Sequence, residues 1–180
     1  MSRKLIIDGN AVYEIDEECV QKKKNRGYKM TKEEFIGLIK KYKGQMYRFA
    51  FSIVKNETDA EDVVAETIKK AYENLNKLKN KGKFKRWIMS ILANEAKRMM
   101  SKRNKEILTD DSNTFENNYY MNDLELKHLV NSLPAEFREV VILYYYERFT
   151  VKEIAQILEV SVGTVKSRLS RAREKLKLLL

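Results

Sequence analysis

The sequence is poor in cysteine, proline, histidine and glycine, and each shortage excludes something. One cysteine, Cys19, rules out an intrachain disulfide, and no cysteine-based metal cluster is expected. One Pro and six Gly in 180 residues leave few tight turns, which favours a helical chain. The single histidine, His128, lies in a polar stretch, and the chain lacks a phosphate loop, a metal-ligand spacing and a nucleophile constellation. We therefore expect no enzyme, no cofactor and no metal.

Long apolar runs are also missing. None approaches the roughly 18 residues that would span a membrane, and the N-terminus has no apolar core long enough for a signal peptide. We expect a soluble, cytoplasmic protein without membrane insertion, in a reducing compartment. Charge is abundant instead, with 36 Lys and Arg against 26 Asp and Glu and a net charge of +10. That excess suits a polyanion, although a membrane surface attracts the same charge.

The C-terminal segment 150–176 has the pattern of a helix-turn-helix. Thr150 and Glu153 form a capping box that begins a first helix, and Ser161 is a suitable N-cap for a second. An apolar stripe at helical spacing follows in the second helix, made of Val165, Leu169, Ala172 and Leu176. The opposite face carries residue types that reach base edges and phosphates in a major groove, namely Lys166, Ser167, Ser170 and Arg171. Arg168 and Arg173 flank that face and suit phosphate contacts.

Upstream, the periodicity predicts further amphipathic helices. A capping box at Thr31 and Glu34 begins a helix to about Val54. Asp59 is predicted as the N-cap of the next helix, whose inward side chains are predicted to be Val63, Val64, Ile68, Ala71, Tyr72 and Leu75. A lysine-rich loop at 77–83 precedes a helix from about Phe84 to Lys102, in which Trp87 is expected in the core rather than as a stacking platform.

The organisation is therefore predicted as all-α, with two small helical domains at 29–103 and 124–180. Residues 104–123 are polar and lack periodicity, which is typical of a flexible linker. Residues 1–28 form an N-terminal extension with a hairpin pattern around Asp8-Gly9-Asn10.

Two blocks of the sequence resemble the extracytoplasmic-function sigma factors of bacterial RNA polymerase, in the sigma-70 family. DAEDVVAETIKKAY with FKRWIMSILANEAKRMM is similar to sigma region 2, and LPAEFREVVILYYYERFTVKEIAQILEVSVGTVKSRLSRAREKL to sigma region 4. The resemblance covers about Met30 to Leu178, with the linker between the blocks. Ala65 and Ile68 depart from it, because Gln and Phe are usual there.

The resemblance implies roles for three groups of residues. Contacts to the beta-prime clamp helices of core polymerase are expected from Asp59, Glu61, Asp62, Val63 and Glu66. Contacts to the minus-10 element and to opened DNA are expected from Lys83, Lys85, Arg86, Asn94, Lys97 and Arg98. Contacts to the minus-35 element are expected from Thr164, Lys166, Ser167, Arg168, Ser170 and Arg171. It also implies a beta-flap contact and an anti-sigma partner.

Two alternative interpretations stay open, one for the acidic residues and one for the whole chain. The acidic residues at 59–62 also complement the positive end of a helix dipole, and that role needs no protein partner. The chain as a whole could instead be a stand-alone helix-turn-helix regulator whose N-terminal helices dimerise or sense a ligand. The lysine-rich loop beside a basic helix favours the sigma factor, which promotes promoter recognition and DNA opening in transcription initiation, in a stress or envelope response.

Overall fold

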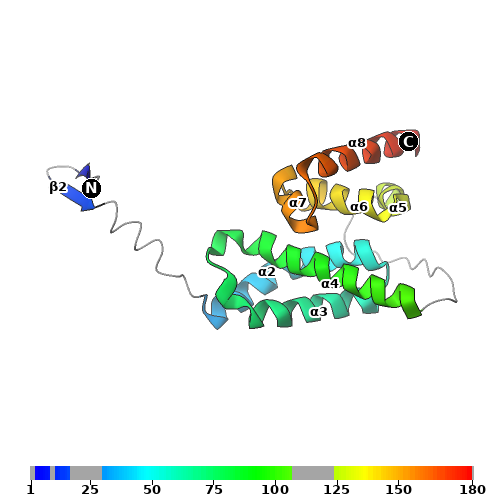
Figure 1. Ribbon diagram of the computed structural model, residues 1–180, viewed down its shortest axis with the longest axis horizontal. Helices are drawn as coiled ribbons and strands as arrows, with labels where there is room; N and C mark the ends of the chain where they lie inside the picture. The colour runs from blue at the N-terminus through cyan, green and yellow to red at the C-terminus, as the bar shows by residue number, and fades with distance from the viewer. Residues whose placement is uncertain (1–2, 9–10, 17–29, 107–123, 180) are drawn as a thin grey trace.

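The computed structural model describes residues 3–8, 11–16, 30–106 and 124–179 of the chain. Strands β1 (Arg3–Asp8) and β2 (Ala11–Asp16) pair antiparallel, with Arg3 opposite Asp16 and Asp8 opposite Ala11. The predicted hairpin is therefore confirmed. It lies apart from all of the helices in Figure 1.

Helix α2 (Lys32–Val54) begins where the sequence predicts it. Thr31 accepts a hydrogen bond from the Glu34 amide, and the Glu34 carboxylate accepts one from the Thr31 amide, which completes the capping box. The helix ends at Lys55, whose backbone is left-handed with φ 54°. The face that the helix buries includes Phe35, Met46, Phe49 and Ile53.

Helix α3 (Glu57–Glu73) corrects two predictions. Its N-cap is Asn56, whose side chain accepts from the Asp59 amide at 2.9 Å, so Asp59 lies inside the first turn. Asparagine caps as well as aspartate, and Asn56 comes first along the chain. Tyr72, predicted inward, is 49% exposed, and its ring is tilted against that of Phe35 with the centroids 5.6 Å apart.

Two short 3-10 turns, η1 (Leu75–Lys77) and η2 (Lys81–Lys83), form the lysine-rich loop before α4 (Phe84–Glu106). Helix α4 runs into the segment predicted as linker. It packs on α2 and α3 through Phe84, Ile88 and Leu92, which are buried, and Trp87 packs partly buried against the same core. We call α2, α3 and α4 the first bundle.

The second bundle consists of α5 (Leu124–Ser132), α6 (Ala135–Val141), the π-helical turn η3 (Ile142–Tyr146), α7 (Val151–Leu158) and α8 (Val162–Leu179). Pro134 is the N-cap residue of α6. The π-turn was not predicted from the sequence. Outside the hairpin, the described residues confirm the all-α fold class.

The helix-turn-helix is formed by α7 and α8. The capping box of Thr150 and Glu153 begins α7, and the Ser161 hydroxyl accepts from the Thr164 amide at 2.9 Å at the start of α8. Between them Glu159 is left-handed, with φ 58°. Helix α8 buries Val165, Leu169 and Ala172.

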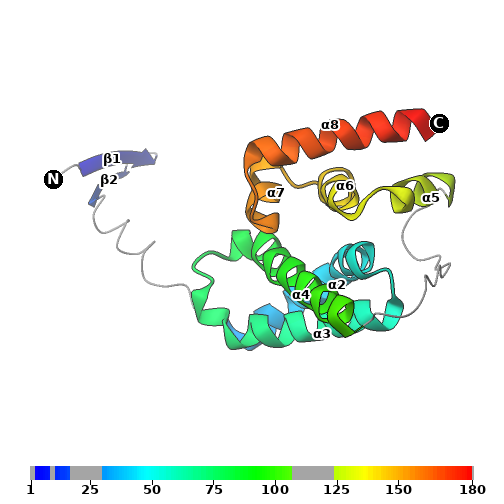
Figure 2. The ribbon, with the colours of Figure 1, turned by 45° about the vertical axis from the view of Figure 1, so that its right-hand side comes forward.

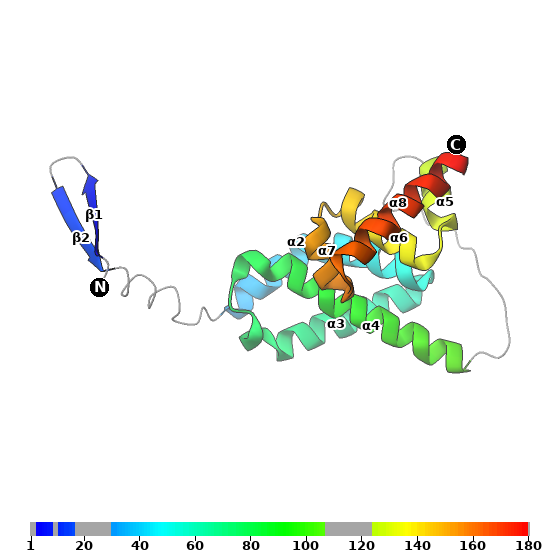
Figure 3. The same cartoon turned by 45° about the horizontal axis from the view of Figure 1, so that its top comes forward.

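The two bundles pack against each other, with α7 on α4 and α6 on α2. Figure 2 shows the second bundle above the first, with α8 on the far side from the first bundle. Figure 3 shows α7 and α8 lying over α4 and α2. Within the described residues, no helix has the length and apolar character that crossing a membrane requires.

Candidate nucleic-acid interface

The predicted duplex-reading face is on the outer side of α8. The side chains of Lys166, Ser167, Ser170 and Arg171 are all exposed, opposite the buried stripe that anchors the helix. Ser167 donates to the Thr164 carbonyl at 2.9 Å, and Lys166 and Arg171 carry the charge. The face is accessible in the arrangement that the two bundles adopt.

Two of the predicted residues on α8 also have partners inside the second bundle. Arg168 forms an ion pair with Glu136 of α6 at 3.0 Å, and its side chain is only 23% exposed. Thr164 lies 2.8 Å from the Ser161 hydroxyl, within the cap that begins α8. Both therefore contribute to the fold as well as to any DNA contact.

The acidic start of α3 is split between exposed and structural residues. Glu61 and Asp62 are exposed, whereas Asp59 accepts from Arg103 of α4 at 3.0 Å. Val63 is 1% exposed and packs in the core of the first bundle. Val63 lies in the apolar stripe that packs α3 against α2 and α4, and its predicted contact with core polymerase stays a prediction.

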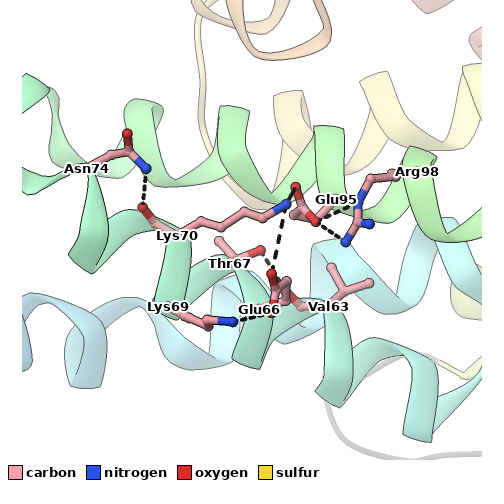
Figure 4. Close-up of polar contacts among 8 residues, drawn as sticks. All are labelled: Val63, Glu66, Thr67, Lys69, Lys70, Asn74, Glu95 and Arg98. Carbon is pink, nitrogen blue, oxygen red and sulfur yellow. Dashed lines mark hydrogen bonds and ion pairs between the residues drawn. The ribbon is translucent and has the colours of Figure 1, made fainter.

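A polar network joins α3 to α4 on the side of the first bundle shown in Figure 4. The Glu95 carboxylate, nearly buried, accepts from Lys70 at 2.6 Å and from Arg98 at 2.8 Å. Burial raises the pKa of Glu95, but the hydrogen bonds from Lys70 and Arg98 outweigh it and lower the pKa overall. Glu66 adds ion pairs to Lys69 and Lys70 at 3.9 Å.

The predicted minus-10 residues of α4, all but Arg98, hydrogen-bond to the second bundle. Asn94 donates to the Glu159 carboxylate at 2.9 Å, and Lys97 donates to the Leu158 carbonyl at 3.1 Å. Arg86 donates to the Gln156 side-chain oxygen. In this arrangement these donors are occupied by groups of α7 and of its C-cap residue, Glu159. Lys83 is exposed in η2.

A second contact closes the other end of the same interface. Lys85 donates to the Glu147 carbonyl at 2.6 Å, and its ammonium lies 4.6 Å from the centre of the Phe149 ring. Arg48 of α2 donates to the Glu147 carboxylate at 2.8 Å. Burial lowers the pKa of Lys85, and the neighbouring Glu147 partly offsets that effect.

In the described part of the chain, no group of three or more His, Cys, Asp or Glu side chains is placed to hold a metal ion.

The comparisons with known proteins agree with this division of the chain. Sigma-70 region 2 matches residues 38–106, and sigma-70 region 4 matches residues 123–176. RNA polymerase sigma factor SigV of Bacillus subtilis (strain 168) is 34% identical over 156 residues, covering 83% of this chain and 93% of that protein. The chain belongs to the extracytoplasmic-function sigma factors of the sigma-70 family.

Other relatives of this sigma factor support the same assignment. ECF RNA polymerase sigma factor SigM of the same organism is 31% identical over 147 residues, covering 77% of this chain and 90% of that protein. Among solved structures, the sigma factor RpoE of Bartonella quintana, in complex with the anti-sigma factor NepR, has a TM-score of 0.71 and 30% identity. The match covers 82% of this chain and 96% of the RpoE chain. The first bundle corresponds to region 2 and the second to region 4, so this sigma factor acts in promoter recognition and transcription initiation.

Sequence reasoning missed the residues that join the two bundles of this sigma factor. Arg138 is buried and donates to the carbonyls of Ser52 at 2.5 Å and of Leu133 at 2.8 Å. Both residues stand beside other charged residues, Arg138 beside Glu139 and Glu147 beside Arg148, so no local sequence signal marks them as buried and paired.

Proposed function

We propose that this sigma factor grips promoter DNA through two surfaces and core polymerase through a third. The second bundle reads the minus-35 element in duplex form with the outer face of α8. The observation that carries this is the exposure of Lys166, Ser167, Ser170 and Arg171 on a helix whose opposite stripe is buried. A bidentate contact to a base from that face is worth ~1–3 kcal/mol of discrimination.

The first bundle engages the minus-10 element with α4 and the loop before it. Asn94 supplies a donor and an acceptor for a base edge, while Lys83, Lys85, Arg86, Lys97 and Arg98 supply positive charge along the backbone of opened DNA. Arg98 is fixed by Glu95, which limits the positions its guanidinium can take. Because the second bundle occupies Asn94 and Lys97 in this arrangement, engagement requires the bundles to separate.

The beta-prime clamp helices of core polymerase bind the start of α3 in this proposal. Glu61 and Asp62 supply exposed carboxylates. Asp59 and Glu66 also contribute, although Asp59 already pairs with Arg103 and Glu66 with lysines of α3. The beta flap contacts the second bundle. The domains extend from residue 29 to the end of α4 and from 124 to 180, with the linker between them.

The remaining parts of the proposal follow from these roles. The chain is a specificity subunit and not an enzyme, needs no cofactor, and acts in the cytoplasm beside polymerase. An anti-sigma factor is expected as partner, since RpoE of Bartonella quintana was solved with NepR. A stand-alone helix-turn-helix regulator is the less favoured alternative, because both sigma regions match in order.

Run-off transcription tests the proposal. The full chain is added to core polymerase on a promoter library, and transcripts are sequenced to recover the preferred minus-35 and minus-10 elements. We expect promoter-specific transcripts that depend on the added chain. A chain that footprints duplex DNA alone but does not bind core polymerase would instead be a regulator.

A further inference from the structure

The interface between the two bundles has a consistent polarity. Wherever the described part of α4 hydrogen-bonds to the second bundle, α4 provides the donor and the second bundle provides the acceptor. The donors are Lys85, Arg86, Asn94 and Lys97. The acceptors are the side-chain oxygens of Gln156 and Glu159 and the carbonyl oxygens of Glu147 and Leu158.

Single-stranded DNA would present the same kind of group to that face. Phosphate oxygens and many base edges are hydrogen-bond acceptors, and a groove that follows a nucleic-acid backbone is lined by cationic donors. The carboxylates of Glu147 and Glu159 add negative charge, as phosphates would. The acceptors at the C-terminal end of α7 and the carbonyl of Glu147 therefore bind the donors of α4 in the way that a DNA strand could.

We propose that region 4 of this chain acts as an intramolecular competitor of single-stranded promoter DNA for the α4 face. This inference rests on the proposed function of that face. In the free protein the acceptor surface, defined by Glu147, Gln156, Leu158 and Glu159, occupies the face and masks it. The outer face of α8 stays exposed in the same arrangement. Only the surface for single-stranded DNA is therefore masked, and the surface proposed to bind duplex DNA stays accessible.

The strength of the masking depends on how often the bundles separate. If the open form is populated about one tenth of the time, the apparent affinity for a single strand falls about tenfold. Each interbundle hydrogen bond is worth only about 1 kcal/mol net, so removing two of them can shift that balance. The competitor is thus weak enough to be displaced by a single strand that binds the α4 face.

The chain offers a variant that opens the interface without damaging the fold. Glu159 has φ 58°, a left-handed backbone that glycine adopts without strain, so Glu159→Gly removes the carboxylate and keeps the turn. Gln156 is exposed on α7, and Gln156→Ala preserves the helix. Glu174→Gln on α8 is the matched control, because it removes one exposed acid from the same bundle away from the interface.

The experiment measures binding of the free full chain to a fluorescent single-stranded oligonucleotide of minus-10 type by anisotropy. Small-angle X-ray scattering reports the radius of gyration of each variant. We expect the Gln156→Ala, Glu159→Gly double variant to bind the strand roughly tenfold more tightly and to expand, while Glu174→Gln behaves as the parent chain.

Two results would overturn the inference. One is a double variant that expands without binding the strand more tightly, which would show that region 4 does not compete for the face. The other is a double variant with unchanged dimensions and unchanged affinity. Neither result would contradict the proposed function, which run-off transcription by the parent chain with core polymerase tests separately. Absence of promoter-specific transcripts in that assay would refute the proposed function itself.

Discussion

Arg48 of α2 and Glu147 of the second bundle are 99 residues apart in sequence and form an ion pair at 2.8 Å. The Glu147 side chain is fully buried and that of Arg48 is 23% exposed. The second carboxylate oxygen of Glu147 has no hydrogen bond and lies 3.7 Å from the Lys85 ammonium. Breaking the pair would therefore leave a buried charge with one distant partner.

We expect Arg48→Met to destabilise the chain by about 1 kcal/mol. Removing one partner of a fully buried pair costs ~3–5 kcal/mol, but the bundles can separate and expose Glu147 to water, which limits the loss to the free energy that holds them together. Urea denaturation measures it. Adding Glu147→Gln removes the uncompensated charge, so the double variant should be more stable than Arg48→Met alone. Additive losses in that cycle would contradict a direct coupling.

Replacing Arg138 by Met should destabilise the chain by about 3 kcal/mol, because backbone carbonyls that its guanidinium satisfies become buried without a donor. Arg138→Lys should recover little, since an ammonium cannot reproduce the planar fork. Arg171→Met, at an exposed position, is the control and should change the unfolding free energy by less than about 0.5 kcal/mol. Equal effects of the two Met variants would contradict the structural role of Arg138.

Glu139 should make the stability depend on pH. Burial raises its pKa above 4.5, opposed by the charges of Lys97, Arg168 and Arg138 and reinforced by that of Glu136. The folded chain therefore holds this proton more tightly than the unfolded chain, and folding loses stability as pH rises from 4.5 through the raised pKa. Glu139→Gln is expected to be more stable than the parent at neutral pH, with the gap closing toward pH 4.5. Denaturation at several pH values checks it, and a constant gap would contradict it.

Reversing charge at Lys166 and Arg171 should abolish promoter-specific transcription and leave core binding intact, because both side chains lie on the outer face of α8. Removing a bidentate contact to a base costs about 1–3 kcal/mol of discrimination. The matched control reverses Lys175 and Lys177 near the end of the same helix, where promoter specificity should persist. Failure of the first variant to bind core polymerase would show that the face serves polymerase.

Asp62→Arg should weaken association with core polymerase, since it replaces an exposed acid at the start of α3 by a cation. A loss of about tenfold corresponds to ~1.4 kcal/mol. Glu73→Arg, an exposed acid at the other end of the same helix, should bind as the parent does. Co-purification with polymerase measures both, and equal retention of the two variants would remove Asp62 from the contact.

Local chemistry made much of the fold predictable. Capping boxes at Thr31 and Thr150 and the apolar stripe of α8 depend on neighbours within one or two helical turns, so the sequence shows them directly. Asp59 was wrong as an N-cap because Asn56, three residues earlier, competes for the same role.

The contacts between bundles could not be predicted in that way. Nothing near Asn94 in sequence indicates that Glu159 lies beside it, since helical periodicity specifies a face and not its partner. The burial of Val63 was visible in its apolar character, but the resemblance to the family assigned it to the polymerase contact instead. The exposed face of α8 was predictable because its spacing alone separates it from the buried stripe.

Lys97 and Lys85 each donate to a backbone carbonyl of the second bundle, those of Leu158 and Glu147, and Arg138 donates to that of Ser52 in the first. Every residue type carries that oxygen, so the accepting positions can exchange side chains during evolution and still receive the same bond. An alignment of related chains would show the donor residues as conserved, but not the residues whose backbone oxygens accept the bonds. The association of the two bundles could therefore outlast substantial drift in sequence while leaving little trace in it.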